Sequence, residues 1–332
     1  MMKKRSFYLL ILLISLAGIL LFNSNKSQPL ASQTIDIYQR TIEDRILSNQ
    51  LTKRFWKLTD IDINANSVIL IDASTGHVIY EDNSDVALPT ASMAKLMTEL
   101  LVLEAIEAQE LSWNTEVTIS DYAYYISHRP GFASVDLEQD KTYTVEELFQ
   151  AMAIRSANGA SIALAEAVSG SEKAFVQRIN QRAYELGLNN SRFVNSTGLN
   201  NDHLGHFSSV GTIEDTNIMS ARDLATLARY LIINYPVLLE ITSQPELLIN
   251  DQEYQNTNLM LSNVIPYQGV DGLKTGYTDL AGFGFTGTVQ RNDVRLISVV
   301  MGAKSMIDRF IETEKLYDHA FSYIENLPFL NH

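Results

Sequence analysis

Strand-like runs at both ends of the chain enclose a long helical middle, and this arrangement restricts the possible folds more than any other feature. An apolar run over residues 67–74 and a second over 76–80 are joined by a Ser-Thr-Gly turn, which predicts a β-hairpin. Further strand-like runs cover 282–290 and 294–302, whereas helical patterns dominate over 91–235. The sequence therefore predicts one α+β domain with a sheet built from both ends and a helical middle subdomain.

Two helices of this domain can be placed from local signals. Thr144 and Glu147 have the spacing of a capping box, and apolar residues follow them at helical intervals. A last amphipathic helix is expected after the final strand, and its buried face is predicted to carry Met306, Ile307, Phe310 and Ile311.

Charge and composition exclude several classes of function. The 332-residue chain carries a net charge of -14, and phosphate binding needs a basic surface, so we expect no nucleic-acid partner. There are no cysteines, which excludes disulfides, thiolate nucleophiles and cysteine metal sites. His203 and His206 have a spacing that can bind zinc, but in a polar loop we interpret them as solvated side chains. We expect neither a metal nor a cofactor.

The N-terminus has the pattern of an export signal. Three basic residues at 3–5 precede an apolar run over 7–22, so we assign 1–28 to a signal or anchor segment and expect an extracytoplasmic protein. Ser15 and Ala17 offer a small-residue cleavage pair, but cleavage there would leave 19–22 on the mature end. We therefore expect an uncleaved membrane anchor with a cytoplasmic N-terminus. Residues 29–65 form a polar linker and a helical lead-in.

Ser92 and Lys95 are the first candidates for chemistry. Their separation of three residues places a hydroxyl and an amine on one face of a helix. A serine needs a base to act as a nucleophile, and a lysine can be that base when burial or a second cation depresses its pKa. Taken alone the pair is a weak signal, and an ordinary helix N-terminus is the better explanation of it.

Two further polar elements follow along the chain. Ser156 and Asn158 come just after the helix that begins near Thr144, where a loop would present both to a cleft, although they also suit a simple helix end. Lys274, Thr275 and Gly276 lie in a strand-like run. There a lysine and a threonine can hold a carboxylate and a glycine lets a substrate backbone lie close, while a solvent-facing edge strand is the alternative.

Taken in order, Ser-x-x-Lys, Ser-x-Asn and Lys-Thr-Gly are the set of β-lactamases and penicillin-binding proteins. From residue 66 to 316 the chain resembles the low-molecular-mass D-Ala-D-Ala carboxypeptidases, a family of serine peptidases, and the supporting stretches are 193–199, 220–224, 256–258 and 271–282. The resemblance implies a β-lactamase/transpeptidase-like fold with an antiparallel sheet and a catalytic domain over 66–330. It also implies peptidoglycan stem peptides as substrates, β-lactams as ligands and no cofactor; the oligomeric state stays open.

The resemblance assigns a role to each candidate residue. Ser92 is the acylated nucleophile, Lys95 its general base, Ser156 a proton relay towards the leaving amine, and Asn158 orders Lys95 and the substrate amide. The oxyanion hole is formed by the backbone N–H groups of Ser92 and Tyr277. The residues that bind substrate, mainly its terminal carboxylate, are Lys274, Thr275, Gly276, Tyr277, Arg222 and Arg309.

The chain departs from the family pattern in three places. Gly159 follows Asn158 where the family commonly has aspartate, and we expect little mechanistic consequence. The segment 199–220 is longer and more polar than usual, which predicts a different cleft rim. Residues 311–332 are acidic, unlike a membrane-binding helix, so we expect the N-terminal segment to do any anchoring.

Three alternatives share these residues. A serine β-lactamase of class A needs a glutamate that holds the deacylating water, and residues 191–199 contain no acidic side chain. An endopeptidase that cuts D-Ala cross-links uses the same residues and stays open. A catalytically inactive peptidoglycan-binding protein would usually have lost the nucleophile or the base, yet Ser92 and Lys95 are both present.

Overall fold

A five-stranded antiparallel sheet joins the two ends of the described chain. The computed structural model describes residues 58 and 61–325, which belong to one compact unit, Trp56–His332. The sheet has the order β2-β1-β11-β10-β9, and every neighbouring pair is antiparallel. Its strands are β1 (Ser67–Asp72), β2 (Val78–Asp82), β9 (Val270–Thr278), β10 (Gly282–Arg291) and β11 (Val294–Ala303). The predicted hairpin, the two C-terminal strands and the α+β architecture are therefore confirmed.

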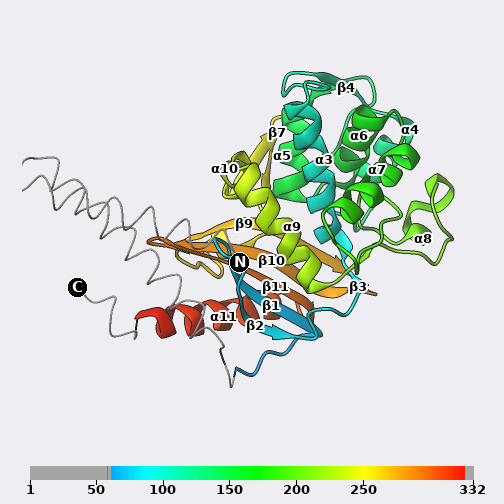
Figure 1. Cartoon of the computed structure of the whole chain (residues 1–332). Coiled ribbons are helices and arrows are strands. Elements are labelled where there is room, and N and C mark those ends of the chain that lie inside the picture. Colours follow the sequence, from blue (N-terminus) through cyan, green and yellow to red (C-terminus); the bar gives the residue numbers. More distant parts are fainter. Residues whose placement is uncertain (1–57, 59–60, 326–332) are drawn as a thin grey trace, which may run out of the picture. The chain divides into compact units, whose positions relative to one another are not determined.

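Alternation along the buried strands builds a core on each face of the sheet. On β1, Val68 and Leu70 pack with α11 (Asp308–Glu325), whereas Ile69 and Ile71 pack into the larger cluster of the helical subdomain. Figure 1 shows α11 on one face of the sheet and the other helices on the opposite face. Both faces are covered, which explains why all six residues of β1 are buried and why the four between Ser67 and Asp72 are apolar.

The predicted apolar face of the last helix is partly wrong. Phe310 is fully buried, but Met306 and Ile311 are exposed. The helix begins only at Asp308, so Met306 precedes it, and Ile311 lies one residue beyond the buried row. The row that packs on the sheet consists of Phe310, Leu316, Tyr317, Ala320, Phe321 and Ile324.

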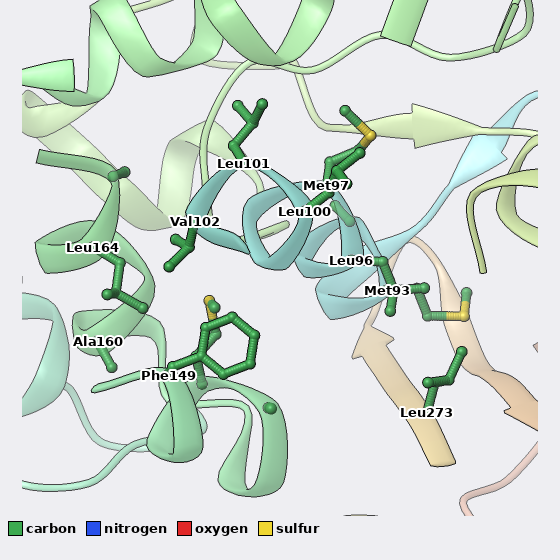
Figure 2. Close-up of a cluster of buried hydrophobic side chains, with 14 of the residues drawn as sticks. Met93, Leu96, Met97, Leu100, Leu101, Val102, Phe149, Ala160, Leu164 and Leu273 are labelled. Carbon is green, nitrogen blue, oxygen red and sulfur yellow. The ribbon is translucent and has the colours of Figure 1, made fainter. Parts of the chain in front are cut away.

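The helical subdomain is built around α3 (Lys95–Glu107), which is buried on nearly every side. Figure 2 shows apolar side chains of α3 beside Phe149 and Leu164 of two neighbouring helices, with Leu273 of β9 near its N-terminal end. The predicted capping box is confirmed: the Thr144 hydroxyl accepts from the backbone of Glu147, whose carboxylate accepts in return. The helices of this subdomain are α4 (Asp121–Ser127), α5 (Val145–Arg155), α6 (Asn158–Ser169) and α7 (Glu172–Glu185).

The remaining elements include α9 (Ala221–Asn234), which packs on β1 and β11, and several short segments. The short helical ones are η1 (Ala91–Ala94), α8 (Asn201–Leu204), η2 (Gly205–Phe207), α10 (Val237–Thr242) and η3 (Leu259–Leu261). Three small hairpins or ribbons pair β3 (Leu88–Pro89) with β6 (Ile218–Met219), β4 (Glu116–Thr118) with β5 (Thr142–Thr144), and β7 (Glu246–Ile249) with β8 (Gln252–Gln255).

Residues ahead of the sheet also contribute to the folded unit. Leu58, Ile63 and Ala65 pack against the cluster beneath α11. The predicted anchor over 1–28 and most of the lead-in over 29–65 lie outside the described residues. Among the helices that the structure does describe, none is both long enough and apolar enough to span a bilayer.

Candidate active site

Ser92 and Lys95 meet at the junction of η1 and α3. Ser92 lies in the 3₁₀ turn and Lys95 is the first residue of the α-helix, so the predicted helical pair spans two kinds of helix. The Lys95 Nζ lies 3.0 Å from the Ser92 Oγ. The spacing in the sequence therefore gives the contact that nucleophile activation requires.

Lys95 is fully buried and held on three sides. Besides the Ser92 hydroxyl, its Nζ lies 2.7 Å from Asn158 Oδ1 and 2.6 Å from the Thr197 carbonyl oxygen. The latter two atoms are pure acceptors. When Lys95 is neutral, its two N–H groups satisfy these acceptors and its lone pair faces the Ser92 hydroxyl. A charged Lys95 that donates to all three oxygens fits the same contacts, so the geometry accommodates both states of the amine.

Electrostatics favour the neutral state of Lys95. Burial lowers the pKa of Lys95 well below its usual value, and the nearby Lys274 lowers it further, whereas Glu99 opposes the shift. Both effects that lower the pKa act against the charged form of the amine. A neutral Lys95 can accept the Ser92 proton.

The Ser-x-Asn element occupies the junction between α5 and α6. Ser156 ends α5 in the left-handed conformation, with φ of 65°, and Asn158 begins α6. Asn158 Nδ2 donates to the Ala133 carbonyl at 3.1 Å, which fixes its Oδ1 towards Lys95. The Ser156 Oγ is buried without a hydrogen-bond partner among the described residues. A buried hydroxyl of this kind is available to a bound group.

The loop that contains Thr197 supplies the third hydrogen-bond partner of Lys95, and the sequence analysis did not connect this loop to the site. The Thr197 carbonyl is positioned through its neighbour Ser196, whose N–H and Oγ both donate to the buried Glu172 at 3.0 and 2.6 Å. Tyr122 donates to the other oxygen of Glu172 at 2.9 Å. Glu172 follows a helix N-cap, but nothing in the sequence identifies a partner 24 residues away.

The Lys-Thr-Gly element lies on β9 at the edge of the sheet, but it is not solvent-facing. Lys274 and Thr275 are buried, and η1 packs on this strand. Lys274 Nζ donates to the Thr275 carbonyl at 3.3 Å, and Thr275 Oγ1 donates to Thr257 Oγ1 at 2.8 Å. Tyr277, two residues after Thr275, is exposed and stacks on Phe283 with ring centroids 4.1 Å apart.

Gly276 is required for the close packing of η1 on β9. A Cβ at this position would lie 2.7 Å from the Thr90 carbonyl oxygen and 3.2 Å from the Met93 backbone nitrogen. The missing side chain lets η1, and with it Ser92, approach the strand that carries Lys274. The expectation that it also makes room for a substrate backbone stays a prediction.

The two predicted arginines have different positions. Arg309 of α11 is buried and donates to the Gly276 carbonyl at 3.3 Å. Burial lowers the pKa of Lys274 to about 8; Glu99 opposes this shift and Arg309 adds to it. The prediction that Arg222 lies near the carboxylate site is corrected by the structure. Arg222 lies at the start of α9, and its guanidinium pairs with Glu81 of β2 and, at 2.6 Å, with Asp85 in the following loop. β2 and the β9 strand that carries Lys274 are at opposite edges of the sheet.

The departures from the family pattern have structural counterparts. At Gly159 an added Cβ would lie 2.7 Å from the Ala123 carbonyl oxygen, so α4 packs too closely on α6 for the usual aspartate. The segment 199–220 forms α8 and η2, where Phe207 stacks on Tyr122. Within residues 61–325, no cluster of three or more histidine or acidic side chains is arranged to hold a metal ion.

Comparison with known proteins identifies the family of this chain. A family model described as D-alanyl-D-alanine carboxypeptidase matches residues 54–305. The D-alanyl-D-alanine carboxypeptidase DacF of Bacillus subtilis (strain 168) is 35% identical over 277 residues, which are 82% of this chain. Those residues are 66% of that relative, so this chain spans just under two thirds of its length.

Two solved structures have the same fold. A peptidoglycan synthesis regulatory factor (PBP3) from Streptococcus pneumoniae has a TM-score of 0.76 at 38% identity, covering 79% of this chain and 74% of that one. Penicillin-binding protein D2 from Listeria monocytogenes, in its cefotaxime-bound form, has a TM-score of 0.69 at 33% identity, covering 80% and 100%. The family model spans most of the chain, and we conclude that this protein belongs to the D-alanyl-D-alanine carboxypeptidase family.

Proposed function

We propose that this protein removes the terminal D-alanine from peptidoglycan stem pentapeptides through an acyl-enzyme on Ser92. The observation that carries the proposal is the 3.0 Å contact between Lys95 Nζ and Ser92 Oγ, in a setting that lowers the pKa of the lysine. Family membership supports the reaction class. The same site predicts acylation by β-lactams, whose strained amide carbonyl is open to the same attack.

Acylation begins with proton transfer from Ser92 Oγ to neutral Lys95. The serine oxygen attacks the carbonyl carbon of the penultimate D-alanine, and the negative charge develops on the carbonyl oxygen. Backbone N–H groups of Ser92 and Tyr277 are the proposed donors to this oxyanion. Collapse of the intermediate breaks the C–N bond, and the leaving amine takes a proton.

Ser156 is the proposed relay for that last proton. Its hydroxyl is buried and has no partner among the residues described, and it lies two residues before Asn158, which binds Lys95. A proton from the lysine ammonium can pass through such a hydroxyl to the amine. Water then attacks the ester with Lys95 again as base, which releases the shortened peptide and restores Ser92.

Lys274, Thr275 and Arg309 are the proposed group for the substrate carboxylate. Burial lowers the pKa of Arg309 to about 10, so it remains a cation at neutral pH. Thr275 adds a hydroxyl donor beside Lys274. Two cations and a hydroxyl provide the charge-assisted hydrogen bonds that favour a free C-terminal carboxylate.

The reaction is tested by product analysis. We expect the protein to release free D-alanine from a stem pentapeptide, as identified by mass spectrometry. The same assay with a D-Ala cross-linked dimer measures endopeptidase activity. Cleavage of the dimer and not of the pentapeptide would contradict the carboxypeptidase function and indicate an endopeptidase. Rapid turnover of penicillin with no peptide cleavage would indicate a β-lactamase.

For location, we propose that the N-terminal segment keeps the enzyme on the outer face of the membrane. The basic residues 3–5 and the apolar run 7–22 support this proposal. We expect the mature protein to fractionate with membranes and to retain its N-terminus in sequencing. Soluble protein that begins near residue 18 or beyond residue 22 would contradict retention.

A further inference from the structure

Glu99 is a buried carboxyl group that the proposed mechanism does not use. It lies one helical turn after Lys95 on α3 and is completely buried. Neither of its side-chain oxygens has a hydrogen-bond partner among the described residues. A buried carboxyl without partners is costly, and native proteins contain few of them. An apolar side chain of similar length would fill the same space at a lower desolvation cost.

The position of Glu99 links it to the reacting groups. Ser92, Lys95 and Glu99 follow one another at intervals of three and four residues, so they share one face of the η1–α3 segment. Most neighbouring side chains of α3 are apolar, as Figure 2 shows for Leu96 and Leu100, and the polar Thr98 is engaged with the Ser196 carbonyl. The carboxyl therefore belongs to the polar row that leads to the nucleophile.

Burial raises the pKa of Glu99 to about 7, and two lysines oppose this shift: Lys274 of β9, which has the stronger effect, and Lys95 of the same helix. Arg309 of α11 acts on Lys274 in turn. Other elements packed on α3 carry charged groups, but these are engaged elsewhere: Arg155 over Tyr254, Glu166 with Ser120, Glu172 with Ser196, Arg182 with Glu104, and Asp223 with Ser191.

We propose that Glu99 is a positioning residue that sets the protonation states of the lysine pair, as the buried counter-ion that keeps Lys274 charged while Lys95 is neutral. The reaction requires this asymmetry, because Lys95 must accept a proton and Lys274 must attract a carboxylate. Glu99 raises the pKa of both lysines. Since its coupling to Lys274 is the stronger, it favours the proton on Lys274.

The test is the pH dependence of kcat/KM in Glu99→Gln, which removes the charge and keeps the shape. If the proposed function holds, kcat/KM falls at low pH because neutral Lys95 is lost, and this fall is the acid limb of the profile. It falls at high pH because charged Lys274 is lost, and this fall is the alkaline limb. Removing the anion lowers both pKa values, so both limbs should move to lower pH. The alkaline limb should move further, by on the order of one pH unit, which narrows the active range.

Glu104→Gln is the matched control. It makes the same change on the same helix, at a partly exposed ion pair with Arg182, and should leave both limbs in place. Limbs that coincide between wild type and Glu99→Gln, or that move to higher pH, overturn the inference. The inference rests on the proposed function, but the two fail differently: an inactive wild type refutes the function, whereas an active wild type with unmoved limbs refutes only the role of Glu99.

A second measurement covers a Glu99→Gln variant that does not fold. In wild-type protein with ¹³C-labelled side chains, the Glu99 carboxyl and the Lys274 methylene next to Nζ should titrate together, each signal reporting the other's ionisation. Acylating Ser92 with penicillin provides a second state in which to compare the curves. Independent, single-step titrations of the two groups would contradict the coupling and overturn the proposal.

Discussion

Replacing Ser92 with alanine should abolish covalent labelling by penicillin and lower D-alanine release at least about 10⁴-fold, the scale of losses seen when a catalytic serine is removed. The change deletes one oxygen atom, and Ser92 is partly exposed, so the fold should be unaffected. Lys95 keeps its contacts with Asn158 and Thr197 in the variant. The loss would therefore report chemistry and not disorder of the site.

Two measurements make this result decisive. Intact-protein mass spectrometry should show one penicilloyl adduct on the wild type, and peptide mapping should locate it on Ser92. Ser112→Ala, the same change in an exposed turn, should label like the wild type. An adduct on another residue, or full labelling of Ser92→Ala, would remove Ser92 from its proposed role.

The architecture was largely predictable because its main elements are marked by local patterns. Turn residues between two β-branched runs predicted the hairpin of β1 and β2, and the spacing of Thr144 and Glu147 predicted the start of α5. The face of α11 was not predictable in the same way. Met306 and Ile311 are apolar and close to the helix start, and only the position of the sheet shows that they point away from it.

The site divides along similar lines. Ser92 and Lys95 are near in sequence, so their contact follows from helical geometry. The Thr197 carbonyl reaches Lys95 across 102 residues, and a backbone oxygen has no signature in the sequence. Gly276 and Arg222 show the limit of motif reasoning. The packing of η1 on β9 is what requires a glycine at position 276. Acidic neighbours on β2 and in the following loop determine where the Arg222 guanidinium lies.

Lys274→Ala should have an effect on both binding and chemistry. A charge-assisted hydrogen bond is typically worth about 1.5–3 kcal/mol, or roughly one to two decades in kcat/KM. We expect a larger loss, because Lys274 also lowers the pKa of Lys95. Without that cation the pKa of Lys95 rises, so a larger fraction of the base is protonated at a given pH, and the acid limb of the pH profile should move to higher pH.

The substrate itself separates the two effects of Lys274. A peptide that ends in free D-alanine presents a carboxylate, and its amidated counterpart does not. Wild type should strongly prefer the free acid, and Lys274→Ala should lose most of that preference, while Lys173→Ala on the exposed side of α7 should keep it. Lys274→Arg preserves the charge and should retain part of the activity. If Lys274→Ala keeps the full preference, the carboxylate is bound elsewhere, and the buried Arg309, which donates to the Gly276 carbonyl beside Lys274, becomes the better candidate.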